Sequence, residues 1–333
     1  MYITPQEYLE IIRKEYLQDF IRHGGTSVKF IVPTEEIDPK GLQQQLYDVS
    51  EAEGYLFAAI DAAKTGVHMI DHIFHAVARQ IEWDELAFSF VSRILSSNGF
   101  TVPSRHEFNI RNLAELNELD ETLLPVDIKK LLVKNLFHDY QMCQEFRIAM
   151  MQLCMAQLDP SDVYPVSGNV IKAWLRGELS RVSEIKPALI FQKISRHNAR
   201  HMLSSLSHWL HLTGKSGLMI AMDISRCLVQ RPKPKDLYDD SRYYTHAAIL
   251  DVYEVLRQFI DTTDDMEFCF IAVMATPSFL HPDERSRGVY CYDALKMRIL
   301  DEVHDRYRIN PFSSLIRLSP CPDISGEPRK EIA

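Results

Sequence analysis

The sequence lacks several features that would assign it to a class at once. None of its six cysteines forms a C-x-x-C pair; they are Cys143, Cys154, Cys227, Cys269, Cys291 and Cys321. No apolar run approaches the roughly 20 residues that a membrane span requires, and the first residues, MYITPQEYLE, do not have the pattern of a secretory signal. We therefore expect free, buried thiols in a cytoplasmic protein, because disulfides are rare in reducing compartments.

Basic charge is also in short supply. The 333 residues contain 37 Lys and Arg against 46 Asp and Glu, which gives a net charge of -9. This balance argues against non-specific wrapping of nucleic acid, although a local basic patch stays compatible with it. With 46% hydrophobic residues and no internal repeat, the composition predicts an ordinary globular protein.

Familiar catalytic and metal motifs are missing too. The sequence has no G-x-S-x-G elbow and no H-E-x-x-H pair. Two groups of histidines have helical spacing, but a chain with 13 histidines produces such spacing by chance. We expect packing or surface roles for them rather than a zinc site; they are His68, His72 and His75 beside Asp71, and His197, His201, His208 and His211.

A β-α-β pattern is present near the start of the chain. Residues 28–32 form an apolar, β-branched run, and residues 55–60 form a second one. Between them, residues 33–41 read as a loop and residues 42–53 as a helix. A strand, a tight loop and a helix is the layout that holds nucleotide phosphates in P-loop proteins.

The loop itself departs from the phosphate-binding pattern G-x-x-x-x-G-K-[ST]. Pro33 takes the place of the first glycine, Asp38 and Pro39 take the places of the second glycine and the lysine, and Lys40 comes one position late. The two prolines remove N–H donors. Glu35, Glu36 and Asp38 place three negative charges where a triphosphate would lie, so the layout is present and the chemistry is absent.

The remaining pattern predicts a sheet interrupted by helices. A helix over residues 5–22 has Thr4, Pro5 and Glu7 as its start signals. Further strands are expected at residues 217–223, 267–274 and 314–318, with a helix at 245–260 before the second of them. Other helices are predicted over residues 67–98, 107–119, 126–158, 168–177 and 186–212.

Four residues are candidates for a nucleotide site. Asp223 ends an apolar strand, as a Mg²⁺-binding Walker B aspartate does, but Ile224 follows it where a catalytic glutamate is usual. Thr276 follows a strand in the position of a γ-phosphate sensor, and Lys40 is the loop lysine. Arg298, like Arg306, is a basic residue that could reach a phosphate. The competing interpretations are a strand-end cap, a plain turn and a solvated helix face.

Several segments together resemble a known family. They are GGTSVKFIV, WLRGE, GLMIAMD, YDALKMRILDEVHDR and NPFSSLIRL, in order from residue 24 to residue 318. These resemble the ATP-binding proteins of BREX-type bacterial phage-defence systems, which are P-loop ATPases related to the AAA+ class. The resemblance implies an α/β, AAA+-like P-loop fold with a parallel sheet of about five strands and a large helical insertion. It places the α/β core at residues 16–61 and 214–318 and the insertion at about 66–213, within one domain (1–320) followed by a disordered tail (321–333).

In that family the first loop is an intact G-x-x-x-x-G-K-[ST] and the later strand ends in Asp-Glu, so this sequence departs at both places. The resemblance therefore implies a pseudo-ATPase that serves as a structural or regulatory subunit of a defence complex. ATP and Mg²⁺ would be cofactors only if the degenerate site still binds them. Partners would be other defence-system proteins, such as an active P-loop paralogue, in a homo- or hetero-oligomer. Two alternatives stay open: an atypical NTPase completed by a partner, and a DNA-binding module.

Overall fold

The computed structural model describes the chain except residues 1, 159–165, 230–241, 283–286, 301–309 and 322–333. The chain divides into two compact units. The α/β unit comprises residues 1–69 and 217–333, and the helical unit comprises residues 70–216. Most of the predicted tail lies outside the described residues.

The first helix begins as the sequence predicts. Helix α1 (Pro5–Ile11) has Thr4 as its N-cap, whose side chain accepts a hydrogen bond from the Glu7 amide. The Glu7 carboxylate accepts in return from the Thr4 amide at 3.2 Å, which completes a capping box. The helix continues as a π-helical segment, η1 (Ile12–Phe20).

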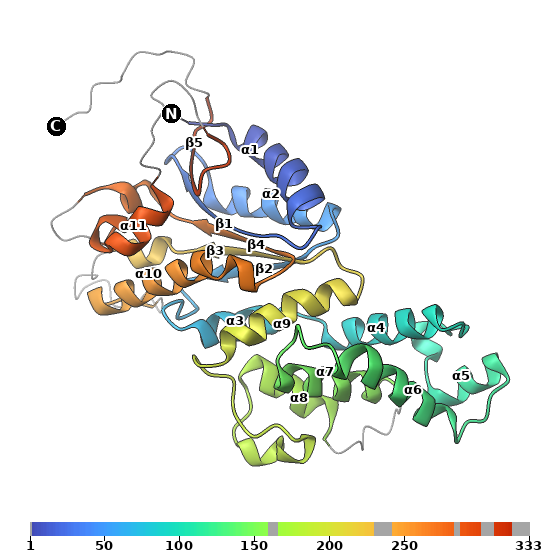
Figure 1. The fold of residues 1–333 in the computed structure, drawn as a ribbon. Coiled ribbons are helices and arrows are strands. Elements are labelled where there is room, and N and C mark those ends of the chain that lie inside the picture. The colour runs from blue at the N-terminus through green and yellow to red at the C-terminus, as the bar shows by residue number, and fades with distance from the viewer. Residues whose placement is uncertain (1, 159–165, 230–241, 283–286, 301–309, 322–333) are drawn as a thin grey trace. The chain divides into compact units, whose positions relative to one another are not determined.

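The α/β unit is built on one parallel sheet (Figure 1). Its strands are β1 (Thr26–Pro33), β2 (Leu56–Asp61), β3 (Leu218–Asp223), β4 (Cys269–Met274) and β5 (Leu315–Leu318). They lie in the order β2-β3-β4-β1-β5, and every pairing is parallel. The predicted α/β class and five-strand parallel sheet are confirmed.

Helices provide the crossovers that parallel strands need. Helix α2 (Pro39–Ala52) connects β1 with β2, and α10 (His246–Asp261) lies between β3 and β4. Helix α11 (Asp293–Ile299) precedes β5. Strand β1 therefore lies between two strands that come more than 200 residues later, an arrangement consistent with a P-loop-like fold.

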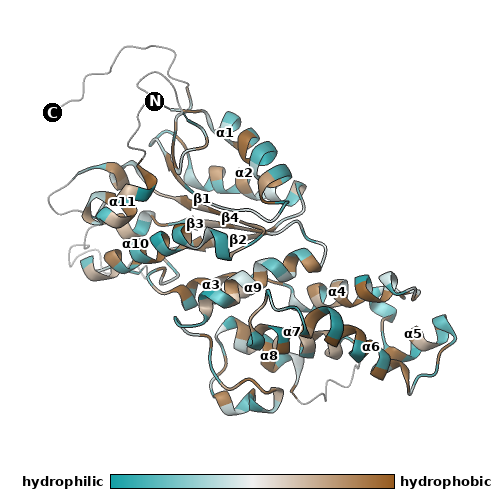
Figure 2. Cartoon of the chain, in the orientation of Figure 1, coloured by the Kyte–Doolittle hydropathy of each residue, from teal (hydrophilic) through white to brown (hydrophobic). Residues whose placement is uncertain are grey.

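Both faces of the sheet are buried. Ile31 of β1 belongs to a core cluster with residues of α1, η1 and α2. Its neighbour Phe30 points to the other face, where it stacks on Phe279 with ring centroids 6.0 Å apart, and Phe279 contacts Tyr253 of α10. Two buried faces explain why the strands read as continuous apolar runs rather than alternating ones, and Figure 2 shows this hydrophobic colouring along the central strands.

The helical unit has its own core. Trp209 stacks on Trp83 at 6.1 Å between ring centroids and contacts Phe146 edge-on at the same separation. All three side chains are fully buried. The helices of this unit are α3 (Ile70–Ala78), α4 (Trp83–Ser97), α5 (Ile110–Asn117), α6 (Leu124–Leu132), α7 (Gln144–Ala156), α8 (Gly168–Arg176) and α9 (Ala199–Leu212).

Several predicted helices have different bounds. The run 67–98 forms α3 and α4, and the run 126–158 forms α6, the π-helical segment η3 (Val133–Phe137) and α7. The helix predicted over 186–212 was wrong in its first part, because only a 3-10 turn, η5 (Lys186–Ala188), precedes α9. Other short turns among the described residues are η2 (Arg105–Glu107), η4 (Val182–Glu184), η6 (Ser225–Leu228), η8 (Thr263–Asp265), η9 (Pro277–Leu280) and η10 (Val289–Cys291).

Two expectations drawn from missing features can be compared with the structure. The prediction of free thiols is confirmed, because all six cysteines are unpaired; Cys154, Cys227 and Cys269 are buried, and Cys321 is exposed. Across the part of the chain that is described, we find no helix with both the length and the apolar character to cross a membrane.

Candidate functional site

The carboxyl ends of the strands form the edge where ligands bind in open parallel sheets. The strand register aligns three of these ends in one row: Asp223 of β3 pairs with Met274 of β4, which pairs with Ile31 of β1. Asp61 of β2 pairs with Asp223 from the other side. Thr276, two residues beyond Met274, therefore lies at the same edge as Asp223 and the loop that follows β1.

The loop after β1 is shorter than the sequence predicts. Helix α2 begins at Pro39 rather than at residue 42, with Asp38 as its N-cap. The Asp38 carboxylate accepts hydrogen bonds from the amides of Lys40 at 3.2 Å and Gly41 at 2.9 Å. In a P-loop protein the first-turn amides of this helix bind phosphate oxygens. Here an oxygen of the chain itself occupies them.

Three of the other amides around this loop are also committed. The Thr34 amide donates to the Leu318 carbonyl at 2.9 Å, and the Ile37 amide donates to the Thr34 carbonyl at 3.1 Å. The Leu42 amide donates to the Asp38 carbonyl, while Pro33 and Pro39 have no amide hydrogen. Few backbone donors are left to surround an anion.

Lys40 is exposed in the first turn of α2, and Glu35 and Glu36 are exposed in the loop before it. No contact brings the Lys40 side chain to Asp223 or Thr276 in the described residues. The charge closest to the first-turn amides is therefore the negative Asp38 carboxylate, which is stabilised by the positive end of the helix dipole.

Asp223 and Ile224 take structural positions. The Asp223 carboxylate accepts from the Ser225 amide at 2.8 Å, so it caps the turn that follows β3. The Ile224 side chain is fully buried, and its amide donates to the Met274 carbonyl. A buried isoleucine can neither accept a proton nor orient a water, which are the tasks of the acid at this place.

Thr276 begins a turn at the strand-end edge. Its hydroxyl lies 2.7 Å from the Ser278 hydroxyl, and it is the N-cap residue of η9. This matches the competing interpretation of a strand-end turn.

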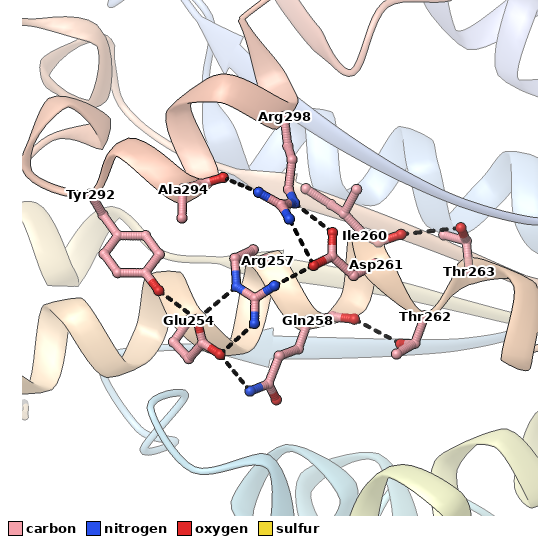
Figure 3. A network of polar contacts seen from close by, with 10 residues as sticks. All are labelled: Glu254, Arg257, Gln258, Ile260, Asp261, Thr262, Thr263, Tyr292, Ala294 and Arg298. Atoms are coloured by element: carbon pink, nitrogen blue, oxygen red, sulfur yellow. Dashed lines mark hydrogen bonds and ion pairs between the residues drawn. The ribbon is translucent and has the colours of Figure 1, made fainter.

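Arg298 lies in a different part of the α/β unit, within a polar network (Figure 3). Its guanidinium donates to both carboxylate oxygens of Asp261, at 2.5 and 3.0 Å. Asp261 ends α10, which runs from the carboxyl end of β3 back to the start of β4, so Arg298 lies toward the opposite edge of the sheet from Asp223. Arg306, the other basic candidate, lies outside the described residues.

The same network contains a strongly perturbed carboxylate. Arg257 binds Glu254 at 2.6 Å and also pairs with Asp261. Hydrogen bonds from Arg257, and further ones from Tyr292 and Gln258, lower the pKa of Glu254 to about 2. These residues join α10 to α11 and supply structural charge pairing rather than a reactive group.

A pocket of about 380 Å³ opens at the strand-end edge, on the β1–β5 side. Thr34 contributes a hydroxyl oxygen that is buried without a hydrogen-bond partner, and Arg317 contributes a guanidinium. The pocket includes none of Lys40, Asp223 and Arg298. The rest of its lining comes from Tyr2, Val32, Pro33, Pro277, Leu280, His281, Pro282 and Tyr290.

Sequence reasoning missed Lys29 in β1. This lysine is 5% exposed, and its ammonium donates to the carbonyls of Phe312 at 2.6 Å and Ser313 at 3.1 Å. It also lies 4.9 Å from the centre of the Tyr16 ring. Burial lowers the pKa of Lys29 to about 8. The only available signal was one charge inside an apolar strand.

The tripeptide Gly214–Lys215–Ser216 was also passed over, although it reads G-K-S. It follows α9 and precedes β3 in the chain. A phosphate loop must follow its strand, so this tripeptide does not replace the degenerate loop.

Two of the histidines that could be read as ligands have other contacts. His75 Nδ1 lies 2.9 Å from the Leu175 carbonyl, and burial lowers the pKa of His75. His208 Nε2 lies 3.0 Å from an Asp139 carboxylate oxygen. Among the residues that the structure describes, no group of three or more His, Cys, Asp or Glu side chains is arranged to hold a metal ion.

A known family matches about half of the chain. The family described as BREX system ATP-binding protein BrxC/D matches residues 166–323. Four of the five segments that suggested the resemblance lie in this range, so the resemblance is confirmed there; GGTSVKFIV and the loop after β1 lie before it. No curated protein and no solved structure matches the chain.

Proposed function

We propose that this protein is a pseudo-ATPase that acts as a structural or regulatory subunit of a bacterial antiviral defence complex. In this proposal residues 16–61 and 214–318 are an AAA+-like core within one domain, residues 66–213 are an insertion, and the core is kept for its shape. The family match over residues 166–323 supports the link to phage defence and to ATP-binding relatives.

One observation carries the proposal: the Asp38 carboxylate accepts from the first-turn amides of α2. A phosphate group would need the same two donors. It would have to displace an intramolecular carboxylate and approach Glu35 and Glu36, whose charges repel it. Binding of a nucleotide is opposed at the place where P-loop proteins gain most of their affinity.

The chemical step is opposed as well. Phosphoryl transfer depends on positioned charge, and the loss of one charge-stabilising group reduces a rate by roughly 10³-fold. Here Ile224 replaces the general base and is buried, while the Asp223 carboxylate is engaged with the Ser225 amide. Losses within one group of residues are not additive, but no residue is left to place both Mg²⁺ and a water.

The partners in this proposal are other proteins of the same defence system, including an active P-loop ATPase. We also propose that the protein acts in the cytoplasm. Its free thiols support a reducing compartment, because all six cysteines are unpaired.

Calorimetric titration with ATP and Mg²⁺, followed by a phosphate-release assay, tests the proposal. We expect a Kd no tighter than about 1 mM, which corresponds to about -4 kcal/mol, and no turnover. Asp223→Ala is expected to leave both results unchanged. Micromolar binding with turnover that disappears in Asp223→Ala would overturn the proposal.

The same assay separates the two alternatives. Phosphate release that appears only when a partner protein is added would favour an NTPase completed in trans. A gel-shift affinity that falls steeply with salt concentration would favour a DNA-binding module.

A further inference from the structure

The helical unit exposes an apolar surface at one of its ends, around the connection between α5 and α6. Leu123 is 62% exposed there, and three other apolar side chains are about half exposed. We define the acidic surface as the four apolar residues Leu116, Leu119, Leu123 and Val126 with the exposed acids Glu115, Glu118, Asp120, Glu121 and Asp127.

Acids outnumber bases on this surface. Arg111 pairs with Glu115 at 3.0 Å and Lys130 pairs with Asp127 at 2.9 Å. Between these two pairs, residues 116–126 contain three acids and no base. Glu118 itself has a positive φ of 55°, a conformation that is uncommon for residues other than glycine. The chain thus presents apolar side chains within a negative rim.

A second exposed apolar surface lies in the segment before α9. Leu189 and Phe191 are 65% and 66% exposed, while Ile190 between them is fully buried. We define the basic surface as Leu189 and Phe191 with the exposed residues Arg181, Lys186, Lys193 and Arg196. The one acid within residues 181–197, Glu184, accepts from the Arg181 amide.

The basic surface is held firmly by the unit beneath it. The Gln192 carbonyl accepts from the Trp174 indole at 3.0 Å, and Ile185 and Ile194 are buried on either side. Leu189 has a φ of 64°, a second non-glycine residue in the left-handed region. An anchored segment that points a leucine and a phenylalanine outward is suited to contact another molecule.

We propose that the acidic surface of one copy of this chain docks onto the basic surface of a second copy. Each surface has apolar side chains inside a charged rim, and the two rims have opposite signs, which is the complementarity that selects a partner. Figure 1 shows the α5–α6 end and the segment before α9 well apart on the helical unit, so the two surfaces of one copy do not pair.

Such a contact is head to tail. Each copy uses one surface to bind the next copy and leaves its other surface open, so assembly continues until a ring closes or a filament forms. The proposal does not rest on the proposed pseudo-ATPase role, because both surfaces lie in the helical unit and neither includes a residue of the phosphate-loop region.

Light scattering on the full-length chain, after gel filtration over a range of concentrations, tests this assembly. The wild type is expected to exceed the monomer mass of 38.6 kDa, to grow with concentration, and to shrink as salt screens the charges. Lys186→Glu/Lys193→Glu removes the basic surface, and Glu118→Lys/Glu121→Lys removes the acidic one. We expect each variant to be monomeric, with association weakened about 100-fold by like charges.

Mixing the two variants provides the sharpest readout. The first variant keeps its acidic surface and the second keeps its basic surface, and the two altered surfaces again carry opposite charges, so an equimolar mixture should recover species larger than either monomeric variant. Lys14→Glu/Lys64→Glu makes the same change in charge on exposed lysines of the α/β unit, and this control should assemble like the wild type. Equal melting temperatures verify that all the variants fold.

Three results would overturn the proposal. They are a wild type that stays monomeric at every concentration, a mixture of the two variants that stays monomeric, and a control that dissociates as the surface variants do. If the monomeric wild type instead binds single-stranded DNA and Lys186→Glu/Lys193→Glu abolishes that binding, the basic surface faces nucleic acid and not a second copy.

Discussion

The Asp38 cap can be tested by changing one residue in three ways. Asp38→Ala removes the oxygen that accepts from the amides of Lys40 and Gly41. Asp38→Ser keeps a capping oxygen but removes the charge, and Asp38→Asn keeps the shape as well. The series separates the hydrogen bonds from the electrostatic attraction between a carboxylate and the helix N-terminus.

The size of each effect follows from the geometry. Both hydrogen bonds are at the surface, so loss of the cap should cost about 1 kcal/mol. In a unit the size of the α/β unit (residues 1–69 and 217–333), that lowers the melting temperature by about 2–4 °C. Loss of the charge alone should cost about 0.5 kcal/mol, so Asp38→Ser and Asp38→Asn should melt within about 2 °C of the wild type.

Urea unfolding followed by circular dichroism, together with thermal melting, measures these differences. The same variants are then titrated with ATP and Mg²⁺. We expect no turnover in any of them, because Pro33, Pro39 and Ile224 remain in place. The reasoning fails if Asp38→Ala is as stable as the wild type while Asp38→Ser is less stable, since the carboxylate would then not be capping α2.

Two further predictions concern charged groups of the α/β unit. The Arg257 hydrogen bonds hold the pKa of Glu254 at about 2, below the ordinary 4.5, so the stability that the ionised carboxylate adds is complete above about pH 4.5 and is lost as the pH falls toward 2. Because solvent screens this partly exposed carboxylate, Glu254→Gln should remove only about 1 kcal/mol at pH 6 and should flatten the acid unfolding curve. Unchanged curves from pH 2 to 6 would contradict this prediction. Burial lowers the pKa of Lys29 from 10.5 to about 8, so between these pH values the unfolded chain binds one more proton than the folded chain. The wild type should therefore gain stability relative to Lys29→Met as the pH rises from 8 to 10.5. Urea unfolding across that range measures the difference in stability, and a difference that stays constant would refute the prediction.

Local patterns predicted the elements of the α/β unit well. The strands at residues 26–33, 56–61, 218–223 and 269–274 are apolar, β-branched runs, and such runs have few alternatives to a buried parallel strand. Capping also has a short-range cause, and the Thr4–Glu7 box is present as predicted. Asp38 followed by Pro39 was an equally local cap signal, but comparison with a phosphate loop led to its interpretation as a damaged lysine position.

Long-range pairing was out of reach of the sequence patterns. Nothing in the spacing indicates that Arg298 pairs with Asp261, 37 residues away, or that Thr34 and Arg317 line one pocket. The segment before α9 misled the prediction for a different reason. Its apolar residues recur at helical intervals, but Pro187 and the left-handed Leu189 interrupt the backbone, and Ile190 and Ile194 are buried from an irregular loop.

The position of β1 in the sheet has a consequence for synthesis on the ribosome. Thr26 pairs with Cys269, and Phe30 pairs with Leu315, so this strand leaves the exit tunnel long before either neighbour exists. The contiguous residues 70–216 can meanwhile form their own core, since domains fold as units during translation. A chain released early, before residue 315, would expose one bare edge of an apolar strand, and stalled or truncated copies should therefore aggregate or require a chaperone.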